Sequence, residues 1–107
     1  MNETLTDFGR FAEPSLYILV SLSEGPRHGY AIMTDVESVS GRPMGAGTLY
    51  GALARLEQRG LIAALEPEER RRPYRLTAAG ARALETQLTR LRSFADTGLA
   101  RLRGRTT

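Results

Sequence analysis

The 107-residue sequence contains no cysteine, no lysine and no tryptophan. Without cysteine the chain cannot form a disulfide, a thiolate nucleophile or a cysteine-ligated zinc site. Its single histidine, His28, is a poor start for a metal site, because Asp35 and Glu37 do not follow it at a coordinating spacing. We therefore expect no metal ion and no bound cofactor.

Long apolar runs are also missing. The longest, residues 16–22, is interrupted by Ser21 and is far too short to cross a bilayer. No targeting segment is visible. These features predict a cytoplasmic protein without membrane association.

Recognisable catalytic motifs are missing as well. No nucleophile can be paired with a base in a familiar setting. The glycine-rich segment "GRPMGAG", residues 41–47, lacks the lysine and the preceding strand of a phosphate-binding loop. The sequence therefore predicts a binding protein rather than an enzyme, with no catalytic residues.

Charge is present but unevenly distributed. Residues 1–69 carry five arginines and ten acidic residues, whereas residues 70–107 carry ten arginines and two acidic residues. The two parts have formal charges of −5 and +8, and the whole chain has +3. A basic region of this kind suggests a polyanionic partner, although a long solvated helix can carry the same charges.

Three helices are predicted before residue 61. The first begins at Pro14 and is apolar nearly all round, and the second spans about residues 28–40 and is capped by Gly41. The apolar stripe of the second helix comprises Tyr30, Ile32, Met33, Val36 and Val39. The third helix lies in "GTLYGALARLEQRGLI", residues 47–62, and Gly60 closes it. Its inward residues are Leu49, Leu53 and Leu56.

A hairpin and a long helix follow. "LIAALE", residues 61–66, and "PYRL", residues 73–76, predict two strands joined by the charged turn "PEERRR". Thr77 is a candidate N-cap for a helix from residue 78 to about 103. Three helices and a hairpin are the order of a winged helix-turn-helix. The predicted fold is mainly α with a small β-hairpin.

The last helix carries a second apolar seam in heptad spacing. Its members are Ala81, Leu84, Leu88, Leu91, Ala95, Gly98 and Leu102. A partner helix would bury this seam, although a packing stripe within the chain is the alternative. We interpret residues 1–12 as an arm, with a short leading helix as the alternative, 13–76 as a winged helix-turn-helix and 77–107 as a dimerisation helix with its tail. The residues expected at the dimer interface are Leu84, Leu88, Leu91, Ala95 and Leu102.

The outer face of the third helix is unusually bare. When its leucines point inward, the opposite side of the helix carries Gly47, Gly51, Ala54 and Gln58. Thr48 and Arg55 lie on one flank of this side, and Tyr50 lies on the other. Glycine in mid-helix costs roughly 1 kcal/mol relative to alanine. The glycines either allow tight turns or let the helix approach base edges closely, and we favour the second interpretation for Gly51. Glutamine and arginine can then pair with adenine and guanine.

Several of these segments resemble the PadR family of bacterial transcriptional regulators. They are "GPRHGYAI", "SGRPMGAGTLYGALARLEQRGLI" and "RRRPYRLTAAGARAL". The resemblance covers roughly residues 16–84 and implies a homodimer joined by its C-terminal helices. It also implies binding to a palindromic operator, usually as a repressor released by a small molecule or a cellular signal. The single helix after the wing is similar to the short subfamily.

The resulting DNA-binding prediction combines the third helix with the wing arginines. The predicted residues are Gly47, Thr48, Tyr50, Gly51, Ala54, Arg55, Gln58, Arg70, Arg71 and Arg72. Arg70–Arg72 could also be a solvated charge run. Glu68 and Glu69 near the hairpin tip would repel phosphate, so we expect the arginines rather than the tip to contact DNA. His28 could shape the turn or contact a phosphate, and we favour a structural role.

An effector pocket is the least specific prediction. If two C-terminal helices cross between protomers, Tyr17, Leu88, Leu91 and Phe94 could line a pocket between them. The alternative, which we favour, is that they pack the dimer. A winged helix can also lose DNA binding and keep a protein-binding surface, so a protein-interaction module is the alternative function.

Overall fold

A computed structural model describes residues 14–105 of the chain. Within them lie four helices and three strands. The helices are α2 (Pro14–Leu22), α3 (Gly29–Ser40), α4 (Ala46–Gln58) and α5 (Ala78–Arg105). The strands are β1 (Arg27–His28), β2 (Ile62–Ala64) and β3 (Pro73–Leu76). The predicted arm, residues 1–12, lies outside the described residues.

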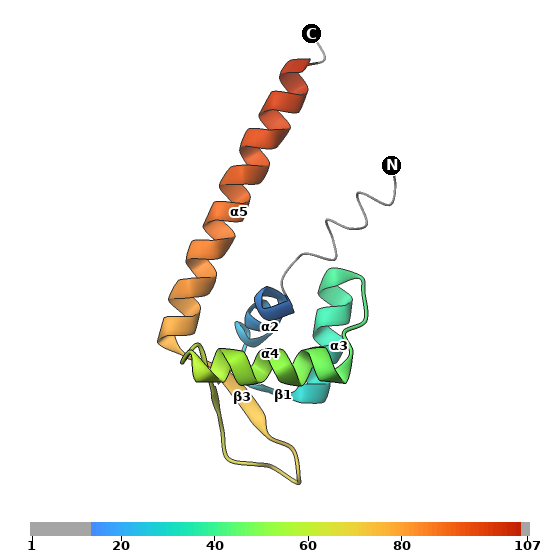
Figure 1. Cartoon of the computed structure of the whole chain (residues 1–107), viewed down its shortest axis with the longest axis vertical. Coiled ribbons are helices and arrows are strands. Elements are labelled where there is room, and N and C mark those ends of the chain that lie inside the picture. The colour runs from blue at the N-terminus through green and yellow to red at the C-terminus, as the bar shows by residue number, and fades with distance from the viewer. Residues whose placement is uncertain (1–13, 106–107) are drawn as a thin grey trace.

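Helices α2, α3 and α4 enclose the core (Figure 1). The leucines predicted to point inward from α4 are buried there, as are Ile32 and Val36 of α3 and three apolar residues of α2. Gly41 and Gly60 follow their helices with φ of 75°, the left-handed conformation that suits glycine. The predicted helix order and caps are thus confirmed.

Two residues of α3 were wrongly predicted to lie on its buried stripe. Tyr30 is 70% exposed, because it precedes Ile32 by two residues and therefore lies on the far side of the helix. Val39 is 55% exposed in the last turn of α3. Helical spacing alone did not show that the core ends before that turn.

The three strands form one antiparallel sheet in the order β1-β3-β2. The hairpin was predicted, and its register pairs Ile62 with Leu76 and Ala64 with Tyr74. Strand β1 was not predicted; it pairs Arg27 with Tyr74 and His28 with Pro73. This pairing fixes the start of α3 against the hairpin.

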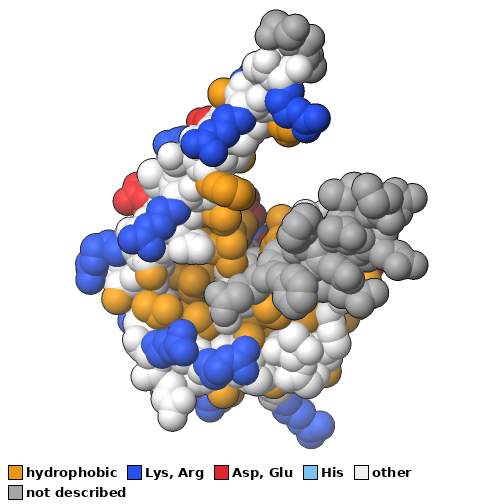
Figure 2. Space-filling model, turned by 45° about the horizontal axis from the view of Figure 1, so that its top comes forward, with side chains coloured by type: hydrophobic (Ala, Val, Ile, Leu, Met, Phe, Trp, Pro, Cys, Tyr) orange, Lys and Arg blue, Asp and Glu red, His pale blue; other side chains and the backbone are white. Residues whose placement is uncertain are grey.

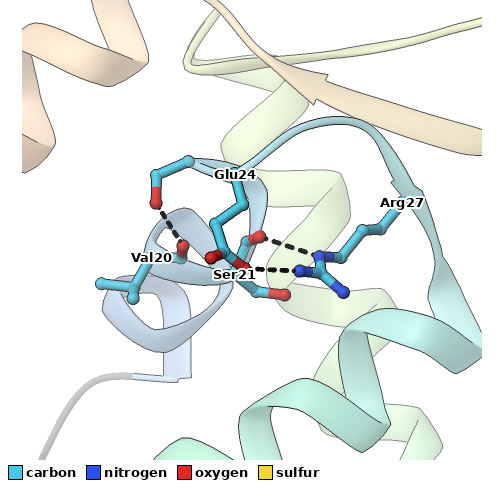
Figure 3. A network of polar contacts seen from close by, with 5 residues as sticks. Val20, Ser21, Glu24 and Arg27 are labelled. Atoms are coloured by element: carbon cyan, nitrogen blue, oxygen red, sulfur yellow. Dashed lines mark hydrogen bonds and ion pairs between the residues drawn. The ribbon is translucent and has the colours of Figure 1, made fainter.

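A small polar network holds the connection between α2 and β1 (Figure 3). The Arg27 Nε donates to the Ser21 carbonyl oxygen at 3.0 Å, and its guanidinium pairs with Glu24 at 2.8 Å. The Ser23 hydroxyl donates to the carbonyl oxygen of Val20. Because Arg27 is the first residue of β1, these bonds position the adjoining His28.

Helix α5 begins on the body and then extends away from it (Figure 1). Thr77 caps it as predicted, since its hydroxyl oxygen accepts from the Gly80 N–H at 3.0 Å. Gly80 is buried, and a Cβ there would collide with the carbonyl oxygen of Leu61. Leu84, one turn later, is 6% exposed and belongs to the core. The first turns of α5 are therefore packed on the body.

Candidate nucleic-acid interface

The outer face of α4 consists of small or polar residues. Gly47, Thr48, Ala54, Arg55 and Gln58 are exposed, and Gly51 is half-buried. The opposite face is buried and comprises Leu49, Ala52, Leu53 and Leu56. The structure therefore places the predicted reading residues together on one accessible side of a single helix, named here the reading face.

Nothing within the described part of the chain requires glycine on this face. Neither Gly47 nor Gly51 has a positive φ, so neither serves a tight turn. A Cβ at Gly47 would meet no atom within 4 Å, and one at Gly51 would meet only the Arg55 guanidinium at 3.6 Å. Alanine would favour the helix at both positions. Folding therefore does not explain why this face has such small side chains. Their small size leaves space for a partner to approach the helix axis closely.

The wing is the β2–β3 hairpin with its connecting residues 65–72. At its tip Glu69 and Arg70 have φ of 46° and 71°, and the backbone groups of Glu68 and Arg71 bond to each other in both directions. This is a two-residue hairpin turn with positive φ at both central positions. The predicted six-residue turn is therefore a narrower two-residue turn, with Arg70 in the turn and Arg71 and Arg72 between it and β3.

The wing arginines lie beside the reading helix. A cleft of about 280 Å³ joins the flank of α4, the start of α3 and the wing. We call it the wing cleft, and its lining residues are His28, Gly29, Tyr30, Tyr50, Arg70, Arg71, Arg72 and Tyr74. The Tyr50 ring lies directly against Gly29, where a Cβ would collide with its hydroxyl. Four predicted DNA ligands, Tyr50 and the three arginines, thus meet at one place.

The wing cleft is rich in hydrogen-bond donors. Arg72 donates to the Leu65 carbonyl oxygen at 3.2 Å, which holds its side chain along the wing. Burial raises the pKa of the Tyr74 hydroxyl, Glu57 raises it further, and the Arg72 guanidinium partly opposes both. Tyr74 therefore keeps its proton at neutral pH. Within the described residues no carboxylate lines this cleft, so an anion entering it meets several donors and no negatively charged side chain of the lining.

His28 has the structural role that we favoured. Its backbone is extended at φ −85° and ψ 167°, and its Nδ1 accepts from the Ala31 N–H at 3.4 Å. It is therefore the N-cap of α3. Its Nε2 lies 3.2 Å from the Arg71 Nη1, so the residue also faces the wing.

The sequence did not predict His28, Gly29, Tyr30 and Tyr74 as members of one site. The motif "HGY" and the run "RRRPY" carry them, but residues 28 and 74 come together only through β1 and the wing. A two-residue strand shows no alternating pattern. The sequence therefore offers no periodic signal for this meeting.

The apolar residues of α5 divide into two groups. Leu84 lies in the chain's own core, which corrects its predicted place in the seam. Leu88, Leu91 and Leu102 are 42–57% exposed, and Phe94 is 77% exposed. Figure 2 shows hydrophobic side chains gathered along this helix and continuing onto the body. We call Leu88, Leu91, Ala95 and Leu102 the apolar seam.

The residues of the predicted effector pocket do not meet in the described chain as one site. Leu88 lines a cleft of about 460 Å³ whose other residues are Ser23, Leu84, Glu85, Thr89 and Arg92. Tyr17 instead packs against the core, and Phe94 is largely exposed. The predicted pocket needs a second protomer, so this prediction stays open.

Residues 14–105 contain neither a metal-binding cluster nor a membrane-spanning helix. No group of three or more His, Cys, Asp or Glu side chains there is placed to hold a metal ion. No helix in the same range is both long enough and apolar enough to cross a membrane.

Comparison with known proteins places the chain among regulators of transcription. Residues 18–86 match the family described as "Transcriptional regulator PadR-like family". An uncharacterised 37.1 kDa protein of transposon TN4556 from Streptomyces fradiae is 47% identical over 78 residues, which are 73% of this chain and 23% of that protein. The chain thus spans about a quarter of that relative's length.

Solved structures agree with the family match. A transcriptional regulator from Clostridium thermocellum is 30% identical, with a TM-score of 0.70 over 78% of this chain and 87% of that one. A PadR family transcription regulator from Clostridium difficile R20291 is 28% identical, with a TM-score of 0.72 over 78% and 91%. The range matched by the family, residues 18–86, includes α4, the wing and the start of α5.

Proposed function

This chain belongs to the PadR-like family of transcriptional regulators, and from that premise we propose that it binds double-stranded DNA as a homodimer. We propose further that it acts mainly as a repressor, by occupying a palindromic operator. The observation that carries the proposal is that the wing arginines line one cleft with Tyr50, the α4 residue that flanks the bare reading face. On this surface, the bare side of α4 would fit into a DNA groove, and the neighbouring wing would donate hydrogen bonds to the phosphates of the DNA backbone.

The reading face would enter the major groove. Because its glycines and Ala54 have small side chains or none, the axis of α4 can come close to the base edges. Arg55 and Gln58 are the long side chains on that face, and they suit guanine and adenine respectively. Thr48, at the start of α4, would contact a phosphate. Sequence preference would therefore depend chiefly on Arg55 and Gln58.

The wing cleft would hold the DNA backbone. Tyr50 and Arg70–Arg72 are its ligands, and the three arginines supply charge without sequence information. Because Glu68 and Glu69 lie on the outgoing side of the turn, the returning side, which begins at Arg70, would face the phosphates. The wing thus orients α4 in the groove.

Dimerisation would place two reading faces on one duplex. The apolar seam of α5 exposes large side chains that a second copy of the helix would bury. Two symmetric half-sites would then lie about 34–36 Å apart. Leu88 and Phe94 would pack this dimer, and a small-molecule effector that altered their packing would release the operator by changing that spacing.

The experiment that tests this function is DNA binding at two salt concentrations. The wild-type chain is titrated with the DNA upstream of its own coding sequence, with duplexes selected from random sequence, and with unrelated duplex. Replacing Arg70, Arg71 and Arg72 with Ala should weaken all binding more than about tenfold. The log–log salt slope should flatten by about 0.9 for each phosphate that the variant no longer neutralises.

The matched control removes the same charge elsewhere. Arg82, Arg90 and Arg101 of α5 are exposed and lie off the apolar seam, and replacing them with Ala should leave binding nearly unchanged. Equal weakening in both variants would indicate attraction to net charge only. A wild-type chain that binds no duplex at low salt would contradict DNA binding and favour the protein-interaction module.

A further inference from the structure

His28 faces two donors that its neutral ring cannot both satisfy. The Ala31 N–H lies 3.4 Å from Nδ1, and the Arg71 Nη1 lies 3.2 Å from Nε2. A backbone N–H and a guanidinium only donate, whereas a neutral imidazole has one accepting nitrogen and one N–H. One of the two contacts therefore brings two donors together.

The contact that brings two donors together is the one between His28 Nε2 and Arg71. The Ala31 N–H belongs to the first turn of α3, where backbone N–H groups have no partner within the helix, and it is partly buried. The guanidinium of Arg71 is exposed and can donate elsewhere. In the neutral ring we therefore assign Nδ1 as the acceptor and place the proton on Nε2.

Two donors then stand side by side in the wing cleft. The Nε2–H and the Arg71 guanidinium are 3.2 Å apart, with Arg70, Arg72 and Tyr50 lining the same space. One negatively charged oxygen that accepts from both would resolve the conflict. No described carboxylate lines the wing cleft, and the carboxylates that share a second cleft with His28 are those of Glu66 and Glu68. A phosphate oxygen has this chemistry.

We propose that His28 and Arg71 bind one and the same phosphate group of the DNA backbone. The proposal rests on the DNA-binding function above and adds a ligand from the turn before α3. Because His28 also caps α3, this phosphate would connect the wing to the helix-turn-helix. His28 would thereby fix the angle at which the wing meets the DNA.

The first test needs no DNA, because the chain has a single histidine. Nitrogen-15 NMR of the neutral imidazole should show the proton on Nε2 and a lone pair on Nδ1. Addition of inorganic phosphate should shift the Nε2–H signal in the wild-type chain, and less in Arg71→Ala. A proton on Nδ1, or an Nε2 signal indifferent to phosphate, would overturn the proposal.

The second test separates the two nitrogens of His28. His28→Asn keeps an oxygen that can cap α3 but lacks the outward donor, whereas His28→Gln extends an amide N–H toward Arg71 and loses the cap. We expect His28→Asn to melt near the wild-type temperature and bind a selected duplex about five- to tenfold more weakly. His28→Gln should melt at a lower temperature but bind within about threefold of wild type.

The double variant tests whether one phosphate is shared. In an Arg71→Ala background, the effect of His28→Asn should shrink to less than about twofold, because the shared ligand is already weakened. Equal effects with and without Arg71, or no effect in either background, would overturn this inference alone. Absence of DNA binding by the wild-type chain would instead overturn the proposed function, and the NMR test would still decide the geometry.

Discussion

Helices α4 and α5 both expose much of their surface, but they expose opposite kinds of side chain. The reading face of α4 carries two glycines, an alanine and a few polar groups around a buried leucine face. Beyond Leu84, α5 exposes leucines and a phenylalanine between its arginines. Small residues suit a rigid partner that must come close to the helix axis, whereas large apolar ones suit a partner that excludes water.

The two helices also differ in what requires their glycines. Gly80 of α5 is buried against Leu61, and a Cβ there would strike backbone. Gly51 of α4 faces open space apart from the Arg55 side chain. Packing therefore accounts for the first glycine and leaves the second without a structural reason. Substitutions in both helices test this difference.

The largest effect should follow from a charge in the apolar seam. Leu91→Asp would place a carboxylate at the proposed dimer interface twice, once in each protomer. We expect the dimer dissociation constant, measured by analytical ultracentrifugation, to rise roughly 100-fold or more. Ser93→Asp, an exposed position off the seam, is the matched control and should stay dimeric. A wild-type chain that sediments as a monomer at micromolar concentration would refute the interface.

A smaller effect is expected from Gly80→Ala. The added methyl group must displace the Leu61 carbonyl, so the free energy of unfolding should fall by about 1–3 kcal/mol in chemical denaturation. Gly98→Ala, also in α5 but with open space at its Cβ, serves as the control and should be neutral or stabilising. Equal stability of the two variants would mean that the start of α5 does not pack against Leu61.

The smallest effect should come from the Tyr50 hydroxyl. Tyr50→Phe keeps the ring against Gly29 and removes one donor from the wing cleft, so DNA affinity should fall about two- to tenfold with little change in stability. Tyr17→Phe, in a tyrosine that packs against the core, is the control for DNA binding. An unchanged affinity for Tyr50→Phe would remove that hydroxyl from the proposed phosphate ligands.

Most of the fold could be predicted because it follows local rules. Pro14, Gly41 and Thr77 mark helix ends through their own backbone and capping chemistry, and the leucines of α4 repeat at helical spacing. The reading face followed from the same spacing. These are properties of neighbouring residues, which a sequence displays directly.

What could not be predicted depends on residues far apart in the chain. The meeting of His28 with Arg71 requires β1, whose two residues form no pattern. Leu84 fits a heptad seam as well as a core position, and only its burial in the folded chain decides between them. Tyr30 was misplaced because an aromatic residue suits both a core and an exposed contact surface.

We propose that the reading face is bare for a partner rather than for the fold, and Gly51→Ala distinguishes these two explanations. Its thermal unfolding and its affinity for a selected duplex should be measured on the same sample. We predict that the free energy of unfolding rises by about 0.5–1 kcal/mol, as for alanine in an exposed helix, while DNA affinity falls about tenfold. A variant that is more stable and binds DNA as tightly as wild type would contradict the claim.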